Sequence, residues 1–163
     1  MKRKKAFNVV IFIVAAALFL LIVTKVRADA ATYEITNFDE LVEAARISRE
    51  SGHQNDTFLL KNDIEITEEN QSSLENSDFK YISFGSSDYP FAGTFDGEGH
   101  YISNLKYSSA VLSPASDTGL FSNTTTGAVI KNLTLQNADI QADYRGGIVA
   151  RLCKRNNFWK HNC

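Results

Sequence analysis

The chain has 163 residues, 44% of them hydrophobic, and a formal net charge of −2. Residues 31–150 hold 18 acidic and 7 basic side chains, whereas residues 151–163 hold four basic and no acidic ones. An acidic body lacks the basic face that neutralises phosphates, so the composition argues against a nucleic-acid partner. The length that follows residue 30 is enough for one small domain.

The segment 1–30 has the pattern of an export signal. Four basic residues at positions 2–5 precede an apolar run over residues 9–23, and Ala28-Asp29-Ala30 supplies the small residues of a cleavage site. We therefore predict a signal peptide that is cleaved after Ala30. The alternative is an uncleaved membrane anchor over residues 6–23, a length close to the lower limit for a spanning helix. In both cases the remaining chain is secreted or lies on the cell surface.

A helix is predicted next, after a short extended piece over residues 33–35. Asn37 can cap it, and Glu40, three residues on, completes the pattern of a capping box. One apolar stripe follows helical spacing and consists of Phe38, Leu41, Val42 and Ala45. The helix is expected to run from Phe38 to near Arg49, before Ser51-Gly52. Such a stripe must cover an apolar surface.

The following segments read as strands and loops. Residues 58–66 predict one strand, residues 70–78 predict a loop without apolar periodicity, and strands and turns are expected after Lys80.

An internal repeat is the most informative feature of the chain. The block Ile-Ser-Asn-Leu at 102–105 returns as Ile-Lys-Asn-Leu at 130–133. A second motif, a glycine followed two residues later by phenylalanine or valine, begins at Gly93, Gly119 and Gly147. Its copies are separated by nearly the same interval as the two blocks. Units of this length cannot close a core alone and bury their apolar sides by stacking successive coils.

Stacked coils predict an all-β fold, a parallel β-helix of about two to three coils with the helix near 38–49 capping its N-terminal end. Ile102 and Leu105, and the equivalent pair in the second block, would point inward. Asn104 and Asn132 would stack as a ladder at a turn, because asparagine tolerates left-handed backbone angles. The alternative is an antiparallel β-sandwich in which the repeat is a chance echo.

One family shares these motifs. The block Phe-Ala-Gly-Thr-Phe-Asp-Gly-Glu-Gly-His-Tyr-Ile-Ser-Asn-Leu at 91–105, followed by Gly119-Leu120-Phe121 and Gly146-Gly147-Ile148-Val149, resembles the GLUG-type right-handed β-helix regions of Gram-positive surface proteins. The resemblance covers roughly residues 33–151. It implies a right-handed β-helix from a long extracellular chain, as in adhesins and the forepart of immunoglobulin-cleaving metallopeptidases, acting as a scaffold or binding surface.

The domain expected over residues 31–151 gives way to an anomalous tail at residues 152–163. Both cysteines, Cys153 and Cys163, and the only tryptophan, Trp159, lie there beside an uncompensated basic charge. The change predicts a truncated or frameshifted end. The alternative is a genuine C-terminal cap with a Cys153–Cys163 disulfide.

Catalytic motifs give no defensible active site. The chain has no H-E-x-x-H metal motif. Residues 96–100, Asp-Gly-Glu-Gly-His, could attract Ca²⁺ but lack the further oxygen ligands of a calcium loop and read better as a tight turn. His53 in a polar loop and His161 in the tail have no nucleophile at a useful spacing. We predict no catalytic, cofactor-binding or metal residues, no cofactor and no enzyme activity.

The predicted function is a non-catalytic extracellular module, a scaffold or an adhesin-like binding domain for a host or cell-wall glycan or protein. Contact with a membrane is expected only through the N-terminal segment. Exposed aromatics would mark a binding face, and Tyr101, Tyr107 and Tyr144 are the candidates. The alternatives are an N-terminal fragment of an exported peptidase or polysaccharide-active hydrolase without its catalytic part, or a non-functional gene remnant.

Overall fold

A computed structural model gives the structure of the chain and describes residues 29–107, 117–140 and 145–146. Within these ranges the chain forms short strands and two helices, α2 (Phe38–Ile47) and α3 (Glu68–Glu75). The strands are β1 (Thr32–Ile35), β2 (Thr57–Leu60), β3 (Ile64–Glu65), β4 (Thr94–Asp96), β5 (Tyr101–Ser103), β6 (Lys106–Tyr107), β7 (Asp117–Thr118), β8 (Val129–Lys131), β9 (Thr134–Gln136), β10 (Asp139–Ile140) and β11 (Arg145–Gly146). The apolar run over residues 9–23 and the tail over residues 152–163 lie outside the described residues.

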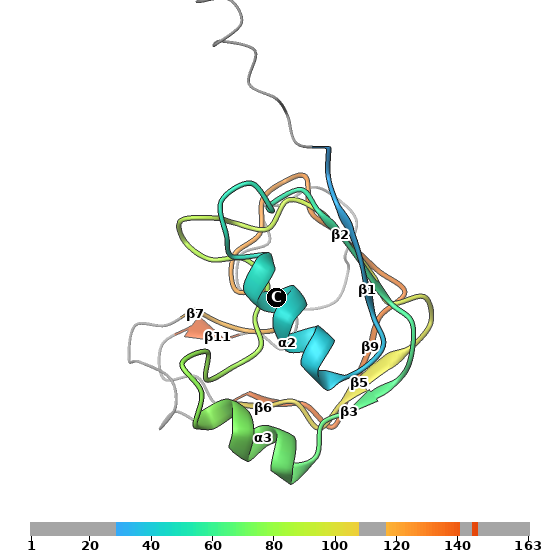
Figure 1. Ribbon diagram of the computed structural model, residues 1–163, viewed down its shortest axis with the longest axis vertical. Helices are drawn as coiled ribbons and strands as arrows, with labels where there is room; N and C mark the ends of the chain where they lie inside the picture. The colour runs from blue at the N-terminus through green and yellow to red at the C-terminus, as the bar shows by residue number, and fades with distance from the viewer. Residues whose placement is uncertain (1–28, 108–116, 141–144, 147–163) are drawn as a thin grey trace, which may run out of the picture.

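Each ladder between the described strands is parallel. One sheet has the order β1-β2-β4-β8, a second has the order β3-β5-β9, and β6 pairs with β10 as β7 does with β11. Figure 1 shows these strands along the sides of a closed outline, with α2 lying across its middle. The expected β-rich fold is therefore confirmed, and the antiparallel sandwich is wrong.

The chain crosses these sheets in three successive passes. We call residues 57–91 the first pass, residues 94–124 the second and residues 129–146 the third. Phe58 pairs in register with Phe95, and Phe95 pairs with Ile130. Ile102 in β5 likewise lies between Ile64 of the first pass and Leu135 of the third. Each pass thus sets its inward apolar residues on those of the pass before.

This register corrects the predicted equivalence of Ile102 and Ile130, because the two residues lie in different sheets. The Ile-x-Asn-Leu block marks a corner that follows a strand, and one pass has more than one such corner. Asn104, Asn132 and Asn137 all have left-handed backbone angles, with φ of 61°, 52° and 50°. A short amide side chain tolerates this conformation better than most residues do. The interval that separates the two Ile-x-Asn-Leu blocks in the sequence also separates two strands that do pair, because Asp117 of β7 lies opposite Arg145 of β11.

The predicted ladder of Asn104 and Asn132 is consequently wrong. Asn104 has Asn137 as its neighbour in the next pass, with 3.5 Å between Nδ2 of Asn137 and Oδ1 of Asn104. Asn132 instead donates from Nδ2 to Oδ1 of Asp96 at 2.9 Å. Those bonded neighbours are 33 and 36 residues apart, close to the 33 and 35 residues that separate the paired strands of these two passes.

The core is built around a column of phenylalanine rings. Five of them are fully buried: Phe58, Phe84, Phe91, Phe95 and Phe121. Their centroids lie 5.0–6.1 Å apart, mostly in edge or tilted geometry, as aromatic quadrupoles favour. Phe84 and Phe121 also form an isolated parallel bridge, which extends the stacking beyond the named strands.

Helix α2 lies against β1 and this core, as its stripe predicts. Leu41, Ala44 and Ala45 are buried in the core cluster. Oδ1 of Asn37 accepts the amide of Glu40 at 3.0 Å, so the predicted N-cap is confirmed. The carboxylate of Glu40 does not close the predicted box and instead accepts from both N and Oγ1 of Thr36 at 2.7 Å. These hydrogen bonds lower the pKa of Glu40.

Two other predictions about local structure are wrong. The segment 58–66 is two strands, because residues 61–63 turn a corner between two sheets. The segment expected as a loop holds helix α3, which a reciprocal capping box between Thr67 and Asn70 begins. Only Leu74 of α3 is buried, so the helix leaves almost no apolar periodicity in the sequence.

Candidate functional site

Charged side chains pair across passes at the corner that follows β2 and β4. Nζ of Lys61 lies 3.0 Å from Oε2 of Glu98 in the second pass and 3.7 Å from Oε1 of Glu34 in β1. The hydrogen bond to Glu98 raises the pKa of Lys61, with a smaller contribution from the charge of Glu34. These three groups are partly exposed, so they form a surface ladder of modest energy.

The predicted turn at residues 96–100 is confirmed, with left-handed backbone at Glu98 and Gly99. Its polar side chains point to separate partners. Asp96 accepts from Nζ of Lys131 and Nδ2 of Asn132, both at 2.9 Å, and from the amide of Glu98 at 3.0 Å. These bonds, that of Lys131 first, lower the pKa of Asp96 to about 2. His100 pairs through Nδ1 with Asp63 of the first pass at 3.0 Å.

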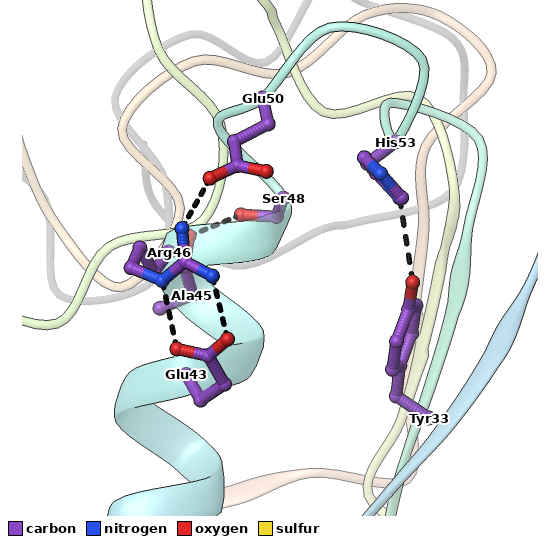
Figure 2. A network of polar contacts seen from close by, with 7 residues as sticks. All are labelled: Tyr33, Glu43, Ala45, Arg46, Ser48, Glu50 and His53. Atoms are coloured by element: carbon purple, nitrogen blue, oxygen red, sulfur yellow. Dashed lines mark hydrogen bonds and ion pairs between the residues drawn. The ribbon is translucent and has the colours of Figure 1, made fainter.

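A second polar cluster joins β1 to the loop before β2. Nδ1 of His53 lies 2.7 Å from Oδ2 of Asp56, and it also lies 3.4 Å from the hydroxyl of Tyr33, a contact drawn in Figure 2. Both contacts use the same ring nitrogen, whereas a proton relay from nucleophile to carboxylate uses the two opposite nitrogens. Burial, and then the charge of Asp56, raise the pKa of Tyr33. The cluster positions an imidazole without the geometry of a triad.

The exposed side of α2 has a local charge network, also visible in Figure 2. Arg46 forms a two-pronged pair with Glu43, with nitrogen to oxygen distances of 2.6 and 2.7 Å, and contacts Glu50 one turn later. The hydrogen bond from Arg46 lowers the pKa of Glu43. All three side chains are about half exposed, so this network supports the helix rather than a reaction.

A polar groove of about 620 Å³ lies between α3 and the corner at Asn104. Its lining residues are Glu65, Ile66, Thr67, Glu68, Gln71, Ser72, Asn104 and Lys106. Gln71 joins its two walls, because its Nε2 donates to the carbonyl of Lys106 at 2.9 Å and to Glu75 at 3.0 Å. Among the described residues, Oε1 of Gln71 is buried without a hydrogen-bond partner. Sequence reasoning missed this groove because it expected a loop where α3 lies.

The two aromatic candidates that the structure describes, Tyr101 and Tyr107, do not form a common exposed face. Tyr107 is only 2% exposed and donates its hydroxyl to the carbonyl of Ile82. Burial raises its pKa well above the usual range. The prediction of an exposed Tyr107 is therefore wrong, because the β6 register turns its ring inward. Tyr101 is half-buried in β5. Tyr144 lies outside the described residues, as do His161, Cys153 and Cys163.

Two kinds of feature are absent from the part of the chain that the structure describes. There, no three or more histidine, cysteine, aspartate or glutamate side chains gather in a group that could hold a metal ion. No helix in those ranges is long and apolar enough to cross a membrane.

The chain is similar to Halomucin from Haloquadratum walsbyi, with 37% identity over 120 residues. The match covers 72% of this chain and 1% of Halomucin, so the chain spans about one hundredth of that relative's length. No family model matches the chain. No solved structure matches it either.

Proposed function

We propose that the chain is a non-catalytic extracellular module of a surface protein, built as a right-handed parallel β-helix of the GLUG type and capped by α2. The parallel, in-register ladders over three passes support this architecture. One observation carries the non-catalytic role: the acids and bases of the corners pair with each other between passes. Lys61 with Glu98, His100 with Asp63, and Lys131 with Asp96 each link two levels of the stack.

An extracellular location has two independent supports. The segment 1–30 has the order of basic start, apolar run and small-residue cleavage site. The chain is also similar to a protein whose name marks it as a mucin, a class of extracellular proteins. From the resemblance to GLUG-type regions we further propose a Gram-positive type of cell surface, with the module either released or retained by residues 6–23.

The ligand site of this adhesin-like module is the polar groove beside α3, and its ligand is a neutral glycan. The volume of the groove suits a few sugar rings. Its walls offer carboxylates, hydroxyls, amides and one ammonium, which are the partners that sugar hydroxyls use. Among the described residues, neither Glu68 nor Lys106 forms an ion pair, so both heads are available to a ligand.

The test is calorimetric titration of the exported protein with a panel of neutral cell-surface oligosaccharides. Glu68→Gln and Lys106→Ala should each weaken binding about tenfold, the effect of one charge-assisted hydrogen bond. Glu69→Gln is the matched control, because Glu69 is equally exposed in the first turn of α3 but does not line the groove. Absence of binding across the panel, or equal loss in the control, would contradict the site. Turnover of a glycan that one named substitution abolishes would favour the hydrolase alternative.

A further inference from the structure

A buried carboxylate, that of Asp56, lies immediately before β2 and faces the first residue after the predicted cleavage site. Asp56 is only 2% exposed. Its Oδ2 contacts Nδ1 of His53 at 2.7 Å, and its Oδ1 accepts the backbone N–H of Ala31 at 2.9 Å. The backbone of Asp56 is held as well, because its N–H donates to the carbonyl of His53 and its carbonyl accepts the amide of Thr94. The carboxylate is therefore a fixed receptor.

The nitrogen of Ala31 is fixed with equal firmness by the parallel ladder. The carbonyl of Ala31 accepts the amide of Thr57 at 2.8 Å, and Thr32 pairs with Thr57 in the register of β1 and β2. Ala31 N thus cannot move relative to Asp56 without breaking the first strand pairing. In the uncleaved chain this nitrogen is a neutral amide, so the buried carboxylate is held by a neutral donor on that side.

We propose that export cleavage between Ala30 and Ala31 creates an α-ammonium group that forms a partly buried ion pair with Asp56, so that processing stabilises the fold. Water adds across the peptide bond: the C–N bond breaks, Ala30 leaves with a carboxylate, and Ala31 keeps its nitrogen as an ammonium. The acceptor 2.9 Å away is already in place. The bond from the Ala31 amide already has an ionised acceptor, and cleavage adds a positive charge on the donor, so the Coulomb attraction of an ion pair is gained at this partly buried site. This inference rests on the predicted signal and not on glycan binding.

The surroundings favour the positive charge. The groups that face this corner are Asp56, Glu50, His53 and Tyr33, and both acids act on the Tyr33 hydroxyl by their charge. A carboxylate partner raises the pKa of an amine, so the added stability is complete between about pH 5 and pH 8, where a carboxylate and a free α-amine are both charged. It is lost as the pH rises above about 8 and the folded amine loses its proton. The pKa of Tyr33 is itself raised, so its hydroxyl stays neutral over this range.

The experiment exports the full chain from a bacterial host and compares it with a chain carrying one glycine inserted between Ala30 and Ala31. The insertion keeps Ala28-Asp29-Ala30 for the peptidase but returns Ala31 N to an amide after cleavage. Intact mass should place the N-terminus at Ala31 in the first protein and at the inserted glycine in the second. At pH 7 the protein that begins at Ala31 should have an unfolding equilibrium constant about tenfold lower than the glycine-inserted protein. This difference between the two constants should vanish near pH 10.

Asp56→Asn in both chains should abolish the difference, because the receptor charge is gone. If this variant fails to fold, selective acetylation of the Ala31 amine replaces it and should give the stability of the glycine-inserted chain. An N-terminus at another residue, an uncleaved chain, or equal stability of the two exported proteins at pH 7 would overturn the proposal. Each of these results leaves the glycan titration unaffected, so the two proposals fail separately.

Discussion

The side-chain oxygen of Ser83 joins the first pass to the second through Ser122, whose amide donates to it at 3.1 Å. Ser83 Oγ in turn donates to the carbonyl of Gly119 at 2.8 Å. Ser122 Oγ donates to the carbonyl of Gly85, and the amide of Gly85 donates to Oγ of Ser48 at the end of α2. A buried column of hydroxyls therefore links the helix to two levels of the stack.

Replacing Ser83 by alanine should lower the free energy of unfolding by about 1–3 kcal/mol, because buried polar groups that lose a partner are costly. The substitution leaves the amide of Ser122 and the carbonyl of Gly119 with one partner fewer. Urea unfolding of the exported protein measures the change. Ser87→Ala is the control, because Ser87 is exposed. The free energy of unfolding of this variant should stay within about 0.5 kcal/mol of that of the unchanged protein. Equal changes in the free energy of unfolding for Ser83→Ala and Ser87→Ala would contradict a stabilising role of the hydroxyl column.

Gly97→Ala should destabilise the protein by about 1–3 kcal/mol or prevent folding, since overpacking against backbone forces a shift. A Cβ at this corner would lie 2.3 Å from the carbonyl oxygen of Asn132 in the next pass, and backbone cannot yield as a flexible side chain can. Gly127→Ala is the matched control, since its nearest neighbour, the carbonyl oxygen of Ala92, would be 3.4 Å away. Thermal unfolding compares the two. A Gly97→Ala protein as stable as Gly127→Ala would show that the passes are not in this close contact.

Asp96 should make the free energy of unfolding depend on pH in the acid range. Its pKa is lowered to about 2, chiefly by Lys131, so its ion pair stabilises the fold above about pH 4. That contribution is lost as the pH falls from about 4 to about 2, when the folded carboxylate takes up a proton. Asp96→Asn should cost about 1 kcal/mol at pH 7, a value reduced for partial exposure, and almost nothing at pH 2. Urea midpoints at both pH values measure this; a constant difference would contradict the pairing.

The amphipathic helix and the stacking of successive units could be predicted from the sequence, because the helix leaves a local apolar stripe and the stacking leaves a repeat. Asn37 and the stripe of α2 specify a helix by themselves, and the glycines and asparagines mark corners. Register could not be predicted, because Asn104, Asn132 and Asn137 meet the same backbone requirement and look alike in sequence. Matching two similar blocks therefore aligned Ile102 with Ile130, although tertiary packing sets Ile102 against Leu135.

The groove could not be predicted from the sequence either, because one of its walls is helix α3 and the other lies far away in the sequence. Helix α3 buries only Leu74, and capping by Thr67 and Asn70 rather than an apolar stripe specifies where it begins. The pattern Thr-Glu-Glu-Asn at residues 67–70 was the signal that could have revealed helix α3. Its partner wall, the corner at Asn104, lies about one pass away in sequence, and only the fold brings the two walls together.

The stacked parallel passes are tested most directly by backbone NOEs between neighbouring strands in the isotopically labelled, exported protein. The account predicts cross-strand contacts between amide and α protons that place Ile102 beside Leu135 and Ile64, and Ile130 beside Phe95. Parallel ladders also give evenly spaced contacts, without the close α-proton pairs of antiparallel strands. Contacts that pair Ile102 with Ile130, or α-proton pairs typical of antiparallel strands, would contradict the stack and the β-helix module built on it.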